Sequence, residues 1–249
     1  MSILDMFKKD SGNVAYRTHA QANRLNDMGK IEEAEAKYKQ AMELYLKAEK
    51  EGFANSKLVS GYCILLMRVG NFEKARALLE KLVSDSTVTS DDKYYLDIDH
   101  AVCTWKLGDV EAAIAEVEEA AKNRKIGLYY NVMGAMQVER AVRTGDFNAA
   151  NEFMKLAVDY DDDDLSTLDN QGWLSYYTGD IDAAQQLFKK AVAKNDRYSP
   201  ALTGLAQVAL DKGDKNAAKE YIGRALTYHF PTTAPLTRKY AEDLSKKIR

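Results

Sequence analysis

Hydrophobic residues recur along most of this chain at spacings of three and four, which places them on one face of an α-helix. Near the C-terminus, for example, Leu236, Tyr240, Leu244 and Ile248 follow one another every four residues, with charged residues between them. Proline, which breaks helices, occurs only three times in 249 residues. The long stretches between glycines are rich in alanine, leucine, glutamate, lysine and glutamine, the strong helix formers. The pattern predicts an all-α fold.

A short phrase recurs six times within this helical pattern. It reads GKIEEA (29–34), GNFEKA (70–75), GDVEAA (108–113), GDFNAA (145–150), GDIDAA (179–184) and GDKNAA (213–218). Intervals of 41, 38, 37, 34 and 34 residues separate its glycines, which we call the hinge glycines: Gly29, Gly70, Gly108, Gly145, Gly179 and Gly213. Recurrence at such a period indicates a repeat protein, whose units bury their apolar faces against one another.

Each copy of the phrase has the chemistry of a junction between two helices. Glycine adopts the left-handed conformation that ends a helix, and the Asp or Asn after it in five copies is suited to cap the next one. A small residue ends each phrase: Ala34, Ala75, Ala113, Ala150, Ala184 and Ala218. Four residues later stands a large apolar one: Tyr38, Leu79, Val117, Met154, Phe188 and Ile222. Three further on is a small or apolar one: Ala41, Leu82, Ala120, Ala157, Ala191 and Ala225. These spacings predict one buried face on a second helix.

Over roughly residues 15–228, these features resemble the tetratricopeptide repeat, whose period is 34 residues. Small residues also stand seven before five of the hinge glycines: Ala22, Cys63, Ala101, Gly172 and Ala206. The resemblance implies a right-handed superhelical solenoid of six helix hairpins plus a C-terminal capping helix. It divides the chain into an N-terminal extension (1–14), a repeat domain (15–230) and the capping helix (231–249).

Four features depart from the family's regular pattern or lie outside it. The longer first intervals predict extended helices, such as one from Lys30 to Glu51 that stops at Gly52. Gly134 lies eleven residues before Gly145, so the first helix of the fourth repeat is expected to be longer or shifted. The segment 232–235 is expected to start the capping helix, with proline in its first turn. At the N-terminus, the apolar residues either cover the first repeat or form a loose tail: Ile3, Leu4, Met6 and Phe7.

Charge and cysteine usage narrow the expected class of partner and the expected cellular compartment. The formal net charge is −3, and basic and acidic residues are mixed along the chain, which argues against nucleic acid as a partner. Cys63 and Cys103 lie among apolar neighbours and are interpreted as buried free thiols of a reducing compartment. The start has no secretory pattern and no stretch is long enough to span a membrane. The expected location is the cytoplasm.

No signature of an enzyme or cofactor site occurs in the sequence. Phosphate loops, dinucleotide-binding glycines, zinc-protease motifs and nucleophile elbows are all absent. Asp97, His100 and Cys103 share one helical face, for which a structural Asp–His hydrogen bond is the favoured interpretation over a metal site. The acidic run 159–164 lacks the glycine and glutamate of a calcium loop, and Asp164 or Asp163 is expected to cap the next helix. We therefore expect no catalytic residue, metal or cofactor.

In the family that the chain resembles, partners bind an inner groove formed by one face of each first helix. Carried over by their distance from the hinge glycines, the expected groove residues are Ile64, Met67, Tyr95, Ile98, Val102, Trp105, Asn170, Trp173, Tyr176 and Tyr177. Exposed aromatic residues in a concave surface are good anchors for a partner, although the tryptophans could instead pack on neighbouring residues. The chaperone-tail clamp of some family members is not expected, since Tyr95 and Asp99 replace its basic pair.

The resemblance therefore favours a non-enzymatic scaffold or adaptor that binds a peptide or helix of an unidentified partner protein in its groove. A self-assembling structural protein is the alternative, and an enzyme acting through Asp97, His100 and Cys103 is a weaker third. We expect no nucleic-acid or membrane partner, and a monomer or weak homo-oligomer.

Overall fold

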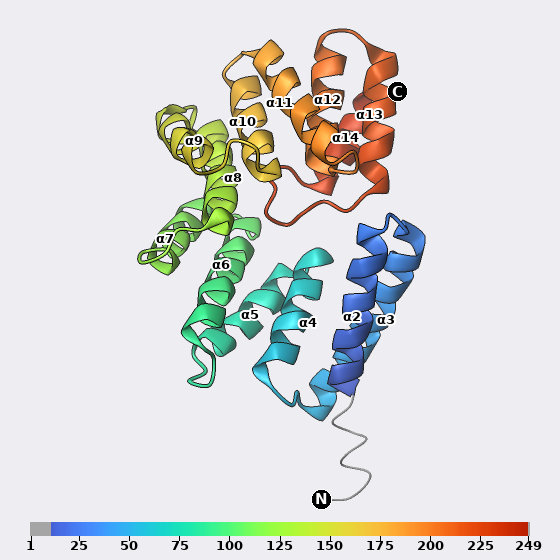
Figure 1. The fold of residues 1–249 in the computed structure, drawn as a ribbon, viewed down its shortest axis with the longest axis vertical. Coiled ribbons are helices and arrows are strands. Elements are labelled where there is room, and N and C mark those ends of the chain that lie inside the picture. Colours follow the sequence, from blue (N-terminus) through green and yellow to red (C-terminus); the bar gives the residue numbers. More distant parts are fainter. Residues whose placement is uncertain (1–10, 249) are drawn as a thin grey trace, which may run out of the picture. The chain divides into compact units, whose positions relative to one another are not determined.

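The computed structural model describes residues 11–248, which contain α-helices and no strand (Figure 1). The helices are α2 (Ser11–Asp27), α3 (Ile31–Glu51), α4 (Ser56–Arg68), α5 (Phe72–Val83), α6 (Ser90–Lys106), α7 (Val110–Ala120), α8 (Gly127–Thr144), α9 (Asn148–Tyr160), α10 (Leu165–Tyr177), α11 (Ile181–Lys194), α12 (Ser199–Asp211), α13 (Lys215–Thr227) and α14 (Arg238–Ile248). The prediction of an all-α fold is confirmed.

The chain forms two compact units, Met1–Gly108 and Asp109–Arg249. Unit 1 contains α2 to α6, and unit 2 contains α7 to α14. Residues 11–14, which the sequence assigns to an N-terminal extension, belong to α2. The apolar residues Ile3, Leu4, Met6 and Phe7 lie outside the described residues.

The hinge glycines end the first helix of each pair, as predicted. All six have positive φ, between 76° and 111°, where a side chain would be strained. The residue after the glycine caps the next helix in four cases: the side chains of Asn71, Asp109, Asp180 and Asp214 each accept a backbone N–H three residues on. Asp146 instead accepts the N–H of Asn148, so α9 begins one residue later than the pattern predicts.

The second helices bury the face that the sequence predicts, with one exception. The alanines that end the repeated phrase are 0–1% exposed, and the large residues four positions later are at most 5% exposed. Ala120 is only partly buried, because α7 ends there and Ala121 turns into the core in its place. The buried positions of the second helices thus follow the local spacing that the sequence shows.

The expected long helices are present. Helix α3 has 21 residues and stops at Gly52, whose φ is 84°. Helix α8 has 18 residues against 13 for α10 and α12, which resolves the irregular fourth repeat as a lengthened first helix. The extra turns of α3 lengthen the interval from Gly29 to Gly70, and those of α8 lengthen the interval from Gly108 to Gly145.

Aromatic residues form much of the core of unit 1. Tyr45 of α3 stacks on Tyr62 of α4 with ring centroids 5.3 Å apart, and His19 of α2 meets it edge-on at 6.1 Å. Burial, with the nearby Arg68 guanidinium, lowers the pKa of His19 to about 4, so this histidine is neutral at physiological pH.

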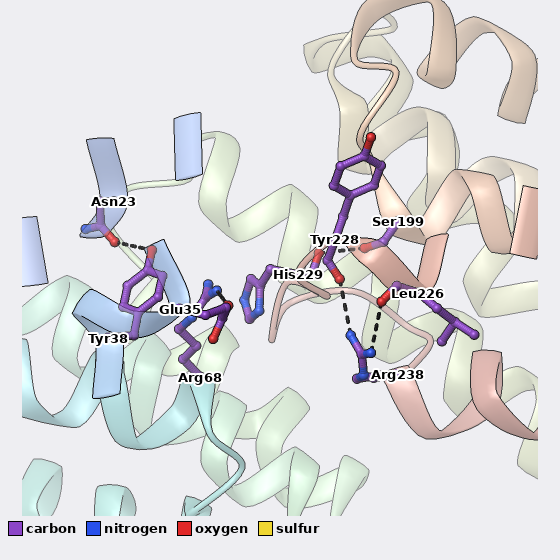
Figure 2. A network of polar contacts seen from close by, with 9 residues as sticks. All are labelled: Asn23, Glu35, Tyr38, Arg68, Ser199, Leu226, Tyr228, His229 and Arg238. Carbon is purple, nitrogen blue, oxygen red and sulfur yellow. Dashed lines mark hydrogen bonds and ion pairs between the residues drawn. The ribbon is translucent and has the colours of Figure 1, made fainter. Parts of the chain in front are cut away.

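Two polar links tie the helices of unit 1 together, as Figure 2 shows. Tyr38 donates its hydroxyl hydrogen to Asn23 at 2.7 Å, which joins α3 to α2. Arg68 at the end of α4 pairs with Glu35 of α3 at 2.6 Å, and its guanidinium lies 3.8 Å from the centroid of the Tyr38 ring.

The closing helix of unit 2 starts later than predicted. Residues 232–236 form turns, and α14 begins at Arg238, with Thr237 accepting the N–H of Tyr240 at 3.3 Å. Pro235 lies within this segment, and α14 begins three residues after it. Arg238 then donates to the carbonyls of Leu226 and Tyr228 at 2.9 and 3.4 Å (Figure 2). The predicted apolar face is confirmed, since Leu244 and Ile248 are buried.

Two glycines of unit 2 provide a matched test of helix packing. A Cβ added to Gly204 of α12 would lie 2.5 Å from the ring of Phe188, whereas one added to Gly223 of α13 would meet nothing within 4 Å. We expect Gly204→Ala to lower the free energy of unfolding by about 1–3 kcal/mol through overpacking. Gly223→Ala is expected to raise it by about 0.5–1 kcal/mol, because alanine favours the helix. Urea unfolding of both variants measures the two signs, and two changes of the same sign would contradict this packing.

Candidate functional site

A cavity of about 570 Å³ lies in unit 1 between α4, α6 and the segment before α6. Its lining combines apolar, hydroxyl and charged side chains: Ser56, Lys57, Ser60, Ile64, Val88, Asp92, Tyr95, Leu96 and Asp99. We call it the α4–α6 cavity. Two of its residues, Ile64 and Tyr95, belong to the groove that the sequence predicts.

Helical spacing and two caps place these side chains. Asn55 begins α4 by accepting the N–H of Leu58 at 3.2 Å, which sets Ser56, Ser60 and Ile64 at four-residue spacing along one face. Thr89 begins α6 by accepting the N–H of Asp92 at 3.1 Å and donates its hydroxyl hydrogen to the Asp92 carboxylate at 2.8 Å. The cavity is therefore formed mainly by side chains of two helices with capped N-termini.

Ile64 and Tyr95 are the large apolar side chains that the cavity leaves open. Ile64 is 48% exposed and Tyr95 is 43% exposed. The ring of Tyr95 packs edge-on against the buried ring of Tyr94, with centroids 5.3 Å apart. An ordered aromatic side chain is an efficient contact for a partner, because little conformational entropy is lost when it is covered.

Asp99 is the most perturbed charged group of the cavity. Burial raises the pKa of its carboxyl to about 7, because the low-dielectric surroundings disfavour the charged form. Among residues 11–248, no group donates a hydrogen bond to this carboxylate. The side chain is thus an acceptor without a donor, next to exposed apolar surface.

The other expected groove residues of unit 1 are buried. Met67, Ile98 and Val102 are at most 4% exposed, and Trp105 is 1% exposed. Of the two alternatives for the tryptophans, packing on neighbouring residues is the one observed, since Trp173 of unit 2 is also fully buried. At these four positions of unit 1 the side chains turn into the core.

In unit 2 the expected residues of α10 form an aromatic cluster. Trp173 lies 5.5 Å from Tyr176, 5.8 Å from Tyr177 and 5.9 Å from Tyr240 of the closing helix, between ring centroids. Tyr176 also donates its hydroxyl hydrogen to Asp211 at 2.6 Å. Asn170 is buried and donates from its side-chain amide to the Asn131 carbonyl at 3.0 Å. The chain's own helices thus contact the surface that the sequence assigns to a partner.

Seven lining residues of the α4–α6 cavity are not among the ten predicted groove residues. Lys57 lies thirteen residues before Gly70, the same distance as that of Tyr95 before Gly108, and Asp92 lies one helical turn before Tyr95. Ser56 is next to Lys57 in the sequence, and Leu96 is next to Tyr95. Val88 comes from the segment before α6, which carries no helical period from which it could be predicted.

The cysteines and the acidic run were the sequence's candidates for metal binding, and the structure assigns neither of them to a metal site. Within residues 11–248 no group of three His, Cys, Asp or Glu residues is placed to hold a metal ion. Cys63 and Cys103 are buried and form no disulfide, as predicted. Asp164 caps α10 by accepting the N–H groups of Ser166 and Thr167, which confirms the interpretation of the acidic run. Its neighbour Asp163 pairs with Lys190 and Lys194.

A second cavity of about 500 Å³ lies in unit 2 between α9 and α10. It contains Lys155, Asp159 and hydroxyl and amide side chains, and none of the predicted groove residues. Across the part of the chain that the structure describes, no helix combines the length and the hydrophobicity that crossing a membrane requires.

Comparisons with known proteins agree with the fold. The family model of the tetratricopeptide repeat matches residues 176–231. TTC0263, a thermophilic tetratricopeptide-repeat protein of Thermus thermophilus, is 17% identical, with 78% of this chain and 97% of that chain covered and a TM-score of 0.59. PilW, a type IV pilus biogenesis factor, is 16% identical over 79% of this chain and 86% of that chain, with a TM-score of 0.55. The human IFIT1 dimer with PPP-AAAA is 19% identical over 86% of this chain and 51% of that chain, with a TM-score of 0.59. A search of curated protein sequences gave no significant match.

Likeness at this level of identity establishes the fold, and the family match adds the sequence signature in unit 2. Together with the hinge glycines and the helix pairs, they show a fold of the tetratricopeptide-repeat type.

Proposed function

We propose that this protein is a non-enzymatic scaffold or adaptor that binds a peptide or helix of a partner protein in a concave groove. The observation that carries the proposal is the α4–α6 cavity, where Ile64 and Tyr95 are exposed beside polar side chains. Recognition sites in proteins commonly combine such apolar anchors with a few polar groups that orient the ligand.

The proposed contact surface is smaller than the ten residues that the sequence selects. Ile64 and Tyr95 would touch the partner directly, and covering their exposed halves supplies roughly 1 kcal/mol each. Met67, Ile98, Val102 and Trp105 would hold α4 and α6 in place from within the core. On α10 of unit 2, Tyr176 and Tyr177 are partly buried and would offer their edges, with Asn170 and Trp173 as support.

The cavity also bears on the class of partner. Asp92 and Asp99 line it and the chain carries a formal net charge of −3, so a nucleic-acid backbone is disfavoured. These charges favour a protein as the partner. We propose that the chain binds it in the cytoplasm, as a monomer or weak homo-oligomer.

Self-association is a second candidate, favoured by an exposed apolar surface on α9. Leu156 is 57% exposed and Tyr160 is 51% exposed, and the ring of Tyr160 stacks on that of Tyr130 at 4.3 Å. Apolar surface of this kind is a common site of association. A monomer mass that is independent of concentration in light scattering would exclude this candidate.

The test of the leading proposal uses a random dodecapeptide display library selected on the full chain. The double variant Ile64→Ser, Tyr95→Ser is expected to bind the most enriched peptide about 30-fold more weakly, the factor that corresponds to roughly 2 kcal/mol. Val69→Ser is the matched control, because Val69 is 60% exposed and does not line the cavity. Fluorescence anisotropy gives the affinities, and circular dichroism checks that the variants fold.

Equal affinity of the double variant and the wild type would place binding elsewhere and refute the proposal. A loss of the same size in Val69→Ser would also refute it, because exposed apolar surface in general would then explain the binding.

A further inference from the structure

We propose that the α4–α6 cavity selects a partner segment in which a lysine or arginine lies next to an apolar residue. The cation would bind the carboxylates of Asp99 and Asp92, and the apolar side chain would contact Ile64 and Tyr95. The inference rests on the proposed function and adds the chemistry of its ligand.

The first argument is the arrangement of charge in the cavity. Asp92 and Asp99 both come from α6, seven residues apart and therefore two helical turns along one face. One oxygen of Asp92 accepts the Thr89 hydroxyl, which leaves its other oxygen for a ligand. The positive group of the lining, the Lys57 ammonium, comes from the opposite helix, α4, and lies 5.1 Å from the centroid of the Tyr16 ring. The α6 wall of the cavity is thus acidic.

The second argument is the state of Asp99. Its carboxylate has no hydrogen-bond donor among residues 11–248, and a half-buried acceptor without a donor is unfavourable. A ligand ammonium or guanidinium would supply both the missing donor and the compensating charge, and such charge-assisted hydrogen bonds are the stronger kind. A carboxylate or phosphate in the same place would meet two like charges, which disfavours acidic peptides.

The groups around Asp99 set the expected dependence on pH. On α4 the neighbours are Lys57 and Cys63; burial and the Asp99 charge together raise the pKa of the Cys63 thiol to about 12, so this thiol stays protonated. On α6 they are Asp92, Tyr95 and the adjacent His100. Because the pKa of Asp99 is about 7 in the free chain, a cationic ligand must displace its proton at pH 6 but not at pH 8.

The first test is the composition of the selected peptides, together with the effect of removing one charge from the peptide and one from the protein. We expect the library to enrich an aromatic or aliphatic residue within three positions of a lysine or arginine. Replacing that basic residue by norleucine should weaken binding to the wild type about tenfold, the usual size for a charged hydrogen bond lost. Asp99→Asn should weaken binding of the basic peptide equally but leave the norleucine peptide unchanged. Glu80→Gln on α5, which does not line the cavity, should change neither.

The second test is the pH profile of the same basic peptide. Its affinity for the wild type should rise roughly tenfold from pH 6 to pH 8, as a carboxyl with a pKa of about 7 ionises. Asp99→Asn should bind with no such rise, whereas His100→Gln should retain it, which separates Asp99 from the neighbouring histidine. Thermal unfolding of each variant confirms that the chain is folded.

Three outcomes would overturn the inference. These are enrichment of apolar peptides without a basic residue, a norleucine peptide that binds as well as the basic one, and an Asp99→Asn variant with wild-type affinity and pH profile. In each case, a continued loss of binding in Ile64→Ser, Tyr95→Ser would show that the cavity is still the binding site, so only the choice of ligand would be wrong. If the double variant also bound normally, both proposals would fail.

Discussion

Phe188→Ala is expected to lower the free energy of unfolding by about 3–5 kcal/mol, a loss typical for removing a fully buried aromatic side chain. Phe188 on α11 is 0% exposed, and its ring is packed tightly against two helices, since a Cβ at Gly172 or Gly204 would come within 2.6 Å of it. Its centroid also lies 5.1 Å from that of Trp173. The ring therefore joins α10, α11 and α12, and alanine would leave a cavity that helices held by their neighbours cannot close.

Because the chain has two compact units, this loss is best measured locally. Hydrogen exchange of the amides of α10 to α13 reports the opening of unit 2 directly, and urea unfolding gives the overall change. Lys189→Ala is the control, since Lys189 is the adjacent residue of α11 and is exposed, so its change should remain within about 0.5 kcal/mol. A loss below about 1 kcal/mol for Phe188→Ala would show that the ring does not hold these helices together.

Tyr45→Ala is expected to lower the free energy of unfolding of unit 1 by a similar amount, about 3–5 kcal/mol. Tyr45→Phe should change this free energy little or raise it. The ring of Tyr45 is fully buried against Tyr62 and His19. Its hydroxyl, however, is buried with no hydrogen-bond partner among the described residues, and burial raises the pKa of that hydroxyl above its usual value. Removing the oxygen alone therefore removes an unsatisfied polar atom without a loss of packing.

The comparison of the two Tyr45 variants is the measurement that matters. Urea unfolding, with hydrogen exchange of α3 and α4, gives both changes in the same unit. If Tyr45→Phe lost more than about 1 kcal/mol, the hydroxyl would have to be making a favourable hydrogen bond, contrary to its surroundings in this structure. A Cβ at Gly61 would lie 2.6 Å from the same oxygen, so Tyr45→Phe should also lessen the loss caused by Gly61→Ala.

The burial of the tryptophans changes how binding should be tested. Trp105 and Trp173 are 1% and 0% exposed, so alanine at either position would remove core packing and lower stability before it affected any partner. A loss of binding in such variants would not locate the site. Ile64 and Tyr95 can be replaced with much smaller effects on the core, because about half of each side chain is already exposed.

The helices, the hinge glycines and the buried face of each second helix could all be predicted from the order of residues. These features depend on interactions within a few residues of the chain. A positive φ requires glycine, a cap reaches two or three residues on, and spacings of three and four define a face. Gly70, Asn71 and Ala75 illustrate this, since the hinge, the cap and the close helix contact follow in six residues as predicted.

Which side chains remain open to a partner could be seen only in the folded chain. Helical spacing places Tyr95 and Trp105 on family groove positions of α6, yet one is 43% exposed and the other is buried. The first helix of a pair contacts neighbours on several sides, and those neighbours come from distant parts of the chain, as Tyr240 does when it packs on Trp173. The α4–α6 cavity likewise combines α4, α6 and Val88 from the segment before α6. Exposure depends on which distant residues pack nearby, and local periodicity carries no information about that choice.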